Sequence, residues 1–360
     1  KSKSALPDIY ANSACVRPAD IDNDGDMDLF IGSRSVPREY GIIPKSYLLI
    51  NDGAGNFTDE TSKYAPAVSN VGMVTDAIWI DLNDDSYEDL VLVGEWMPIR
   101  IFYNSTDGFT EVTDQYGLQN TTGWWNTIAA GDFNNDGHID LVVGNLGLNS
   151  FLKASNTQPV QLYINDFSGN NKLEQILTYY NGSQVYPLAS RDMMIENIPF
   201  LVEKYPKYAD FAGAAIDDIF NEDLLQSAQV RKAVEFASVV LMNNGDETFT
   251  KINLPIEVQF SPVYAILVDD FDKDGFQDML TGGNFSGVPP ELGRYDASYG
   301  NVLLGEGTGS FKSASLQSSG FIVTEEIRQM KKIKTPNNQN QILVVRNNNT
   351  TVIFNQLQNK

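Results

Sequence analysis

The fold of this chain is decided by a stretch that reads DIDNDGDMDLFIG at residues 20–32. Acidic side chains recur through its first nine positions, and a short apolar strand ending in glycine follows. The pattern returns as DLNDDSYEDLVLVG at 81–94, DFNNDGHIDLVVG at 132–144 and DFDKDGFQDMLTGG at 270–283. A weaker version, DFSGNNKLE at 166–174, keeps an oxygen-bearing side chain at positions 1, 3, 5 and 9. Repetition of this kind indicates an array of similar structural units.

The chemistry of these loops predicts calcium, because ligand sets made only of oxygen suit a hard cation. Gly25, Gly137 and Gly275 at position 6 permit the sharp turn that directs positions 1, 3, 5 and 9 at one centre, and the carbonyl of position 7 completes the set. In the second loop Ser86 replaces this glycine, which makes its turn less favourable. An EF-hand is excluded, because position 12 falls inside an apolar strand instead of on a glutamate.

We therefore predict four Ca²⁺ sites, and the sequence leaves occupancy of the fifth loop open. The predicted ligands, with position 7 contributing its carbonyl, are Asp20, Asp22, Asp24, Asp26 and Asp28; Asp81, Asn83, Asp85, Tyr87 and Asp89; Asp132, Asn134, Asp136, His138 and Asp140; Asp270, Asp272, Asp274, Phe276 and Asp278; and, in the fifth loop, Asp166, Ser168, Asn170 and Glu174.

A second signature follows the loops: an apolar strand, a turn rich in Asn and Gly, and another strand, as at 46–60, 99–112, 238–252 and 301–314. These are hairpins. Four antiparallel strands per unit predict an all-β fold, a β-propeller of about six to seven blades in one domain over residues 1–360. We count six units, beginning near residues 14, 72, 124, 160, 262 and 320. The third lacks its own outer hairpin in this interpretation.

Residues 187–237 do not fit a blade. Ser190 is a candidate N-cap, and apolar residues follow at helical spacing. We predict a helical insertion between the second and third strands of the fourth unit.

The runs of the form D-x-[DN]-x-D-G-x-x-D-L-x-[VI]-G resemble FG-GAP/VCBS repeats, which form the blades of integrin α-subunit propellers and of secreted bacterial proteins similar to cartilage acidic protein. The resemblance covers nearly the whole chain. It implies a β-propeller with calcium at the loops and a secreted, periplasmic or cell-surface location. It does not indicate a ligand, because such repeats serve many partners.

Bulk composition excludes several partners. A net charge of −22 argues against nucleic acids and anionic membrane surfaces. The sequence contains no apolar run of 18 residues, so we expect no membrane insertion. One cysteine, Cys15, excludes an intrachain disulfide. The start, KSKSALPDIY, is not a signal peptide, and we expect it to be a cut point in a longer or processed protein.

The loops expected at the other end of the strands are long and differ from one another, and such loops usually carry binding sites. All acidic loops join first to second strands, so these longer loops must emerge on the opposite face. An aromatic side chain there would stack on a sugar or anchor a protein, and packing against neighbouring loops is the alternative for each tryptophan. For Arg34 the alternative is a structural salt bridge. The predicted ligand-binding residues are Arg34, Glu95, Trp96, Trp124, Trp125, Asn145, Asn149 and Phe285.

Catalytic signatures are missing from the sequence. The single histidine, His138, lies at position 7 of an acidic loop, and neither a G-x-S-x-G elbow nor a phosphate-binding glycine loop occurs. We expect a non-catalytic binding or adhesion module for a glycan or a protein. Two alternatives stay open: a polysaccharide-active hydrolase or lyase that uses a carboxylate pair, and a purely structural part of a larger secreted protein.

Overall fold

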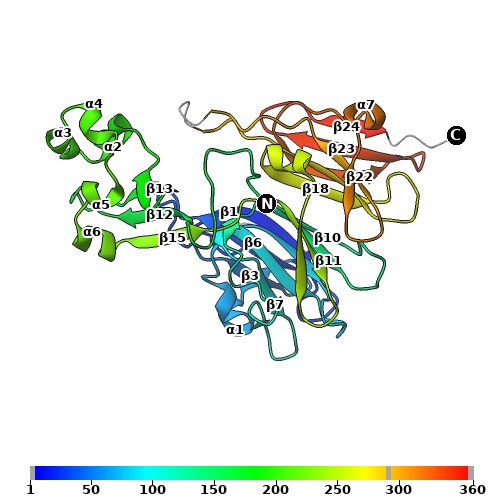
Figure 1. Cartoon of the computed structure of the whole chain (residues 1–360). Coiled ribbons are helices and arrows are strands. Elements are labelled where there is room, and N and C mark those ends of the chain that lie inside the picture. Colours follow the sequence, from blue (N-terminus) through cyan, green and yellow to red (C-terminus); the bar gives the residue numbers. More distant parts are fainter. Residues whose placement is uncertain (1–4, 289–292, 356–360) are drawn as a thin grey trace.

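The computed structural model describes residues 5–288 and 293–355, which fold mainly into antiparallel β-sheets (Figure 1). About 39% of the chain is strand and 12% is helix, so the predicted all-β class is confirmed. Five sheets, which we call radial sheets 1 to 5, share one axis, and a sixth, the inserted sheet, lies beside them.

The radial sheets follow the order of their strands along the chain. Sheet 1 contains β1 (Asn12–Ala19), β2 (Asp28–Ser35), β3 (Tyr47–Asn51) and β4 (Phe57–Asp59); sheet 2 contains β5 (Met73–Ile80), β6 (Asp89–Met97), β7 (Arg100–Tyr103) and β8 (Thr110–Glu111), with β9 (Gly123–Trp124) pairing with β6; sheet 3 contains β10 (Thr127–Gly131), β11 (Asp140–Gly144), β16 (Val239–Asn243) and β17 (Phe249–Asn253); sheet 4 contains β18 (Val263–Asp269), β19 (Asp278–Gly283), β20 (Asn301–Gly305) and β21 (Phe311–Ser313); sheet 5 contains β22 (Ile327–Lys334), β23 (Asn340–Arg346) and β24 (Val352–Asn355).

The inserted sheet and the helices complete the secondary structure. The inserted sheet has the order β14 (Gln184–Pro187), β13 (Glu174–Asn181), β12 (Val160–Asn165) and β15 (Gln229–Ala233); the α-helices are α1 (Thr61–Tyr64), α2 (Arg191–Asn197), α3 (Leu201–Lys204), α4 (Tyr208–Phe211), α5 (Ile216–Ile219), α6 (Glu222–Ser227) and α7 (Leu316–Ser319); the 3₁₀-helices are η1 (Pro66–Val68) and η2 (Ile256–Phe260).

The second strands each contain a continuous apolar run because the radial sheets cover both of their faces. In β6, Leu90 and Leu92 pack toward sheet 1, whereas Val91 and Val93 pack toward sheet 3. Successive side chains of a strand point to opposite faces, so the LVLV run places two residues in each of two apolar layers. Similar layers lie between sheets 3 and 4 and between sheets 4 and 5. The result is a propeller-like stack around one axis.

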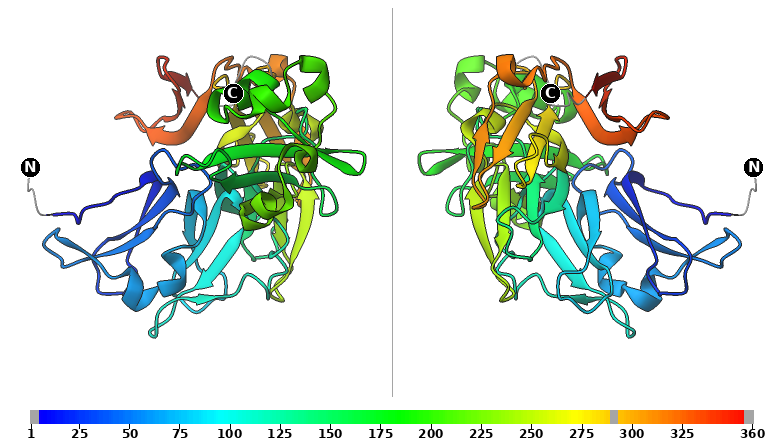
Figure 2. Two further views of the ribbon diagram at one scale, coloured as in Figure 1. Left: turned by 90° about the vertical axis from the view of Figure 1, so that its left-hand side faces the viewer. Right: turned by 90° about the vertical axis from the view of Figure 1, so that its right-hand side faces the viewer.

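The innermost strands β1, β5, β10, β18 and β22 are neighbours in this order and line a channel of about 330 Å³. Four of them carry a bulge near their first residues, and the extra residue of each bulge lines the channel. These bulged residues are Ala14, Thr75, Tyr264 and Arg328. Figure 2 shows sheet 1 (blue) and sheet 5 (orange to red) on the same side of the molecule, as the two ends of the arc of sheets.

The predicted order of units was wrong at the third and fourth units. The hairpin β16–β17 pairs with β11, through Val240 opposite Val142, so it is the outer hairpin of sheet 3. Residues 145–238 are therefore inserted between the second and third strands of that sheet, and the strands near residue 160 belong to the inserted sheet. The expected six to seven blades are not confirmed: within residues 5–288 and 293–355, five sheets share the channel.

The inserted segment has its own apolar core and docks on the radial sheets. Helices α2 to α6 fall within the predicted 187–237 segment, and Ser190 caps α2 by accepting a hydrogen bond from the Met193 N–H. Met194, Leu201 and Phe220 pack against Ile176 of the inserted sheet. Strand β15 lies beside β6 and β9, which places the segment next to sheet 2 (Figure 1). No helix of the described part of the chain is long and apolar enough to cross a membrane.

Candidate metal centres and the axial cleft

The acidic loops of sheets 1 to 4 share one hydrogen-bonding scheme. The position 1 carboxylate accepts two backbone N–H groups of its own loop, as Asp20 does from Asp24 and Gly25, both at 3.0 Å. The position 5 side chain then accepts the N–H of position 7 in every loop. Two residues per loop, at positions 4 and 6, have positive φ. Ser86 adopts this conformation with a φ of 73°, so the second loop makes the same turn without glycine.

The aspartate at position 9 joins each loop to its sheet. Asp28 accepts the N–H of Ile21 at 2.9 Å and that of Asn51, at the end of β3, at 2.8 Å. The same two bonds, one from the N–H of loop position 2 and one from an N–H at the end of the third strand, are accepted by Asp89, Asp140 and Asp278. All four position 9 aspartates are fully buried. Burial raises the pKa of each of these carboxyls, against the lowering effect of the two N–H donors, and it raises the pKa of Asp89 and Asp140 to about 6.

The carboxylates of these loops converge without a basic partner. Oxygens of Asp20, Asp22 and Asp28 all lie within 4.8 Å of one another, and the corresponding residues of the sheet 4 loop are Asp270, Asp272 and Asp278. None of the ion pairs of the described residues involves a carboxylate of these four loops. Like charges held this close repel one another, and a divalent cation relieves the repulsion. The donor set therefore fits a hard cation.

Two loops carry asparagine at position 3 and would need a small rearrangement to bind a cation. The Asn83 amide donates to Asp85 at 3.0 Å, and the Asn134 amide donates to Asp136 at 2.7 Å. Turning the amide over would direct its oxygen, the group that ligates hard cations, toward the centre of the loop. The predicted carbonyl ligands at Asp26, Tyr87, His138 and Phe276 stay predictions.

The fifth loop, between β12 and β13 of the inserted sheet, has the same turn but a different interior. Asp166 accepts the N–H groups of Asn170 and Asn171, as in the other loops. However, the Ser168 hydroxyl donates to Glu174 at 2.7 Å, and the other oxygen of Glu174 accepts the Phe167 N–H at 2.8 Å. These hydrogen bonds occupy both oxygens of one of the two carboxylates. The loop is thus closed by its own donors.

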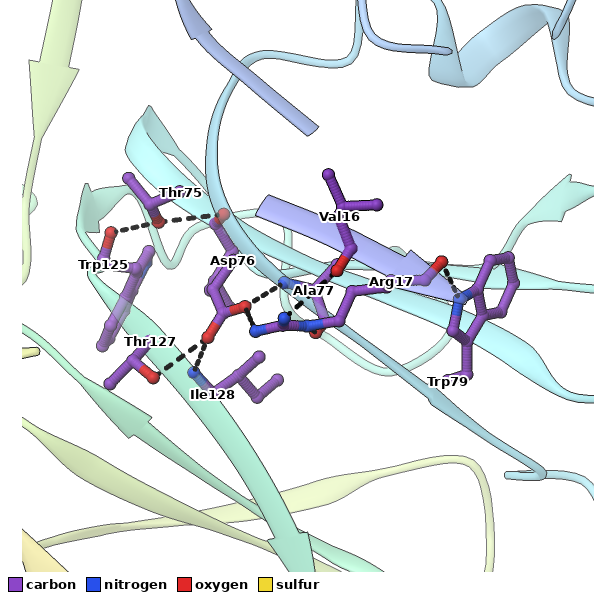
Figure 3. Close-up of polar contacts among 10 residues, drawn as sticks. Val16, Arg17, Thr75, Asp76, Ala77, Trp79, Trp125, Thr127 and Ile128 are labelled. Atoms are coloured by element: carbon purple, nitrogen blue, oxygen red, sulfur yellow. Dashed lines mark hydrogen bonds and ion pairs between the residues drawn. The ribbon is translucent and has the colours of Figure 1, made fainter. Parts of the chain in front are cut away.

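At the axis, a polar cluster that the sequence did not reveal joins three sheets (Figure 3). Asp76 of β5 pairs with Arg17 of β1 and accepts hydrogen bonds from the Thr127 hydroxyl at 3.0 Å and the Ile128 N–H at 3.2 Å, both in β10. Asp76 is 7% exposed, and both of its oxygens are occupied. The cluster ties sheets 1 to 3 together. The only signal in the sequence was a charged residue within an otherwise apolar innermost strand.

The end of the axis opposite the acidic loops opens into a cleft of about 330 Å³, the axial cleft. The ends of β2 and β6 supply Arg34 and Glu95, and the bulges of β18 and β22 supply Tyr264 and Arg328. Arg34 pairs with Glu95 at 2.6 Å, and Tyr40 donates to the other Glu95 oxygen at 2.8 Å. Burial lowers the pKa of Arg34, but the negative charge of Glu95 and the hydrogen bond to it have the larger effect, so the pKa of Arg34 is raised.

Four of the residues predicted to bind a ligand line this cleft: Arg34, Glu95, Trp124 and Phe285. Trp96 lies at its edge, where its indole N–H donates to Tyr40 at 2.9 Å. The salt bridge considered for Arg34 is present, with Glu95 as its partner.

Three predicted ligand-binding residues lie elsewhere, and two assignments were wrong. Trp125 is fully buried between sheets 2 and 3, and its indole donates to the Thr121 carbonyl at 2.8 Å. Asn145 is fully buried as well. Its amide accepts a hydrogen bond from the Trp124 N–H and donates one to the Glu235 carbonyl. Neither is available to a ligand. Asn149 is exposed, but it donates to the Phe260 carbonyl and lies outside the cleft lining.

Among solved structures, the chain is similar to the V. cholerae biofilm matrix protein Bap1, with 9% identity, 97% of this chain and 70% of that chain covered, and a TM-score of 0.37. It is also similar to BBS1N, solved in complex with ARL6DN, with 10% identity, coverage of 97% and 79%, and a TM-score of 0.34. A search of curated proteins gave no match.

The family comparison concerns the acidic loops directly. Residues 81–143 match the FG-GAP-like repeat, and residues 124–163 match the FG-GAP repeat. These ranges contain the second and third acidic loops, whose geometry is that of loops 1 and 4. Residues 81–163 therefore carry the FG-GAP repeat that the acidic loops indicated.

Proposed function

We propose that this protein is a calcium-stabilised β-propeller of the secreted, periplasmic or cell-surface kind, which binds a glycan or protein ligand in the axial cleft without catalysis. The observation that carries the proposal is the position of this cleft. It holds the Arg34–Glu95 pair and Trp124, and it lies at the end of the strands opposite the acidic loops. The strands of the radial sheets thus connect the acidic loops, which would bind calcium, to the axial cleft, which would bind the ligand.

Calcium would be held by the side chains at positions 1, 3, 5 and 9 of the loops in sheets 1 to 4. When bound, it neutralises the converging carboxylates. The buried position 9 aspartates already bond each loop to the end of a third strand, so an ion that fixes the loop would also stabilise the sheet. We do not include the fifth loop, because its position 3 hydroxyl, Ser168, donates to its position 9 carboxylate, Glu174, a side-chain bond that the loops of sheets 1 to 4 do not have.

The absence of catalysis is supported by the chemistry of the cleft. Glu95 is the only carboxylate among the described residues that line it, and both of its oxygens are engaged, by Arg34 and Tyr40. Hydrolysis of a glycosidic bond generally requires two carboxyl groups, one on each side of the bond.

The proposal is tested by binding to a glycan array and to a displayed peptide library, with wild type, Trp124→Ala and Arg34→Ala in parallel. We expect each variant to weaken binding at least tenfold, and Tyr299→Ala, at an exposed residue outside the cleft, to leave it unchanged. Ligands that bind all four proteins equally would contradict the location. Turnover of a polysaccharide that is lost in Glu95→Gln would contradict the non-catalytic role.

A further inference from the structure

A second cavity, of about 570 Å³, adjoins the axial cleft beneath the inserted segment. Its walls combine Trp96 of sheet 2 with Leu162 of the inserted sheet and Met193 of α2. The cavity and the cleft share Tyr40, Trp124, Leu177 and Leu188, so together they form one continuous groove. One end of the groove carries charged side chains, and the other end is apolar.

Trp124, at the junction of the two parts, carries a hydrogen-bond donor without a partner. Its Nε1 atom is buried and has no acceptor among the described residues. The other three tryptophans of the chain all donate: Trp79 to the Arg17 carbonyl, Trp96 to Tyr40 and Trp125 to the Thr121 carbonyl. A buried donor is costly unless it is paired. The donor is therefore unpaired at the junction, and because it is buried the indole must turn before an acceptor in the groove can reach it.

The apolar end is poorly suited to a sugar. The hydroxyl groups of a glycan need hydrogen-bond partners when they leave water, and apart from Tyr40, Gln175 and the helix-capping Ser190 the lining is apolar or aromatic. A large apolar side chain meets the opposite requirement, because its burial against these walls is favourable. Buried apolar anchors of this kind dominate protein–protein recognition.

The charged end favours an acidic group. Arg34 and Arg328 line the cleft, on a chain whose net charge is −22, and Arg328 is paired with Glu326, so Arg34 is the arginine that could meet a ligand. Within the described structure, the Arg34 guanidinium donates only to Glu95, through Nη2, and its side chain is 51% exposed. Its remaining N–H groups are free to receive a carboxylate.

We propose that the groove binds a peptide segment of a partner protein. A large apolar side chain of the peptide enters the cavity, an acidic group pairs with Arg34, and a small rotation of the Trp124 indole brings its N–H to a peptide carbonyl. This inference rests on the proposed function of the cleft, and it narrows the ligand from a glycan or a protein to a protein.

The probe is a displayed library of random twelve-residue peptides, selected on the calcium-loaded protein and screened beside a glycan array. Ala189→Trp fills the apolar cavity, Trp124→Phe removes only the indole N–H, and Tyr299→Ala is the control outside the groove. We expect selected peptides to share a large apolar residue near an acidic one. Their affinity should fall at least tenfold in Ala189→Trp and severalfold in Trp124→Phe, and it should not change in the control.

A second readout is the NMR signal of the Trp124 indole N–H. In protein labelled with ¹⁵N-tryptophan, four indole N–H signals are expected, and the one lost in Trp124→Phe belongs to Trp124. Its proton should move downfield when a selected peptide binds, because it gains an acceptor. This measurement needs no cavity-filling variant, so it remains decisive if Ala189→Trp does not fold.

The outcomes distinguish the peptide inference from the proposed function of the axial cleft as a ligand-binding site. Glycans that bind and lose affinity in Trp124→Phe, with no peptide selected, would overturn the peptide inference and keep the cleft as the binding site. Peptides whose affinity is the same in every variant, or failure of both probes to bind, would overturn both.

Discussion

The two ends of the radial sheets differ in how their loops are built. At one end, four loops of nine residues repeat the same turn, and in each of them the position 6 N–H donates to the position 1 carboxylate. At the other, the groove combines side chains from sheets 1, 2, 4 and 5 with the inserted segment, and equivalent positions carry different residues: Arg34 and Glu95 at the ends of β2 and β6, and Tyr264 and Arg328 at the bulges of β18 and β22. The proposed stabilising site, an acidic loop, is thus repeated in each of the four sheets, whereas the proposed ligand-binding groove occurs once and is built from several sheets.

Removal of calcium should have the largest effect on the acidic end. A site with a Kd near 10⁻⁴ M contributes about 2.7 kcal/mol at ~10 mM calcium. Four sites together should therefore lower the melting temperature by more than ~10 °C when the ion is withdrawn. Differential scanning calorimetry with calcium and with chelator measures the shift. An unchanged melting temperature would break the comparison, since both ends would then be stabilised by packing alone.

Loss of one loop should have a smaller effect that still separates the two ends. Asp140→Ala removes a buried carboxylate that binds the N–H groups of Phe133 and Asn243 and is a predicted ligand. We expect a loss of about 3 kcal/mol in the free energy of unfolding and one calcium fewer per chain. Trp124→Phe, at the other end, should leave the calcium count unchanged. Chemical denaturation and equilibrium dialysis measure both, and an unchanged calcium count in Asp140→Ala would refute the assignment of this loop.

The pH dependence of the calcium-depleted protein sharpens the account of the buried aspartates. The folded state raises the pKa of Asp89 and Asp140 to about 6, so it holds their protons more tightly than the unfolded chain does. Their stabilising contribution is present below about pH 4 and lost as pH rises through 6. Relative to Asp89→Asn/Asp140→Asn, the depleted wild type should lose on the order of 1–3 kcal/mol per site across this range.

Saturating calcium should reverse that trend, because a metal ion requires the deprotonated carboxylates. Parallel pH profiles of wild type and double variant, both without calcium, would argue against the raised pKa values.

The smallest effect is expected in the inserted sheet. In Glu174→Gln the amide oxygen still accepts the Phe167 N–H, and the amide nitrogen can donate to the Ser168 hydroxyl, so this loop stays closed by its own hydrogen bonds. We expect an unchanged calcium count and a change in unfolding free energy below about 1 kcal/mol. Asp28→Asn is the matched control in sheet 1, and it should reduce the calcium count by one. A reduction in Glu174→Gln would place the fifth loop with the other four.

Local patterns carried most of what the sequence could predict. The acidic loops, the hairpins and the Ser190 cap each depend on residues close together in the chain, so their spacing was sufficient. The order of the units was not local. The β16–β17 hairpin follows the inserted segment in sequence and was assigned to the fourth unit, although Val240 pairs with Val142 almost a hundred residues earlier. An apolar strand does not reveal which other apolar strand it joins.

The groove shows the same limit at the scale of single side chains. Trp124 and Trp125 are adjacent, and both were predicted to meet a ligand. Alternation along the chain places Trp125 in the core between sheets 2 and 3 and leaves Trp124 in the groove. The adjoining apolar cavity depends on Met193 and Leu162, which only the docking of the inserted segment brings beside Trp96.

The account is tested most directly by a crystal structure grown in millimolar calcium, with anomalous data to locate the ion. We predict a peak at each of the four acidic loops of sheets 1 to 4 and none at residues 166–174. Loops of sheets 1 to 4 that lack the ion at that concentration, or a peak within 166–174, would contradict it.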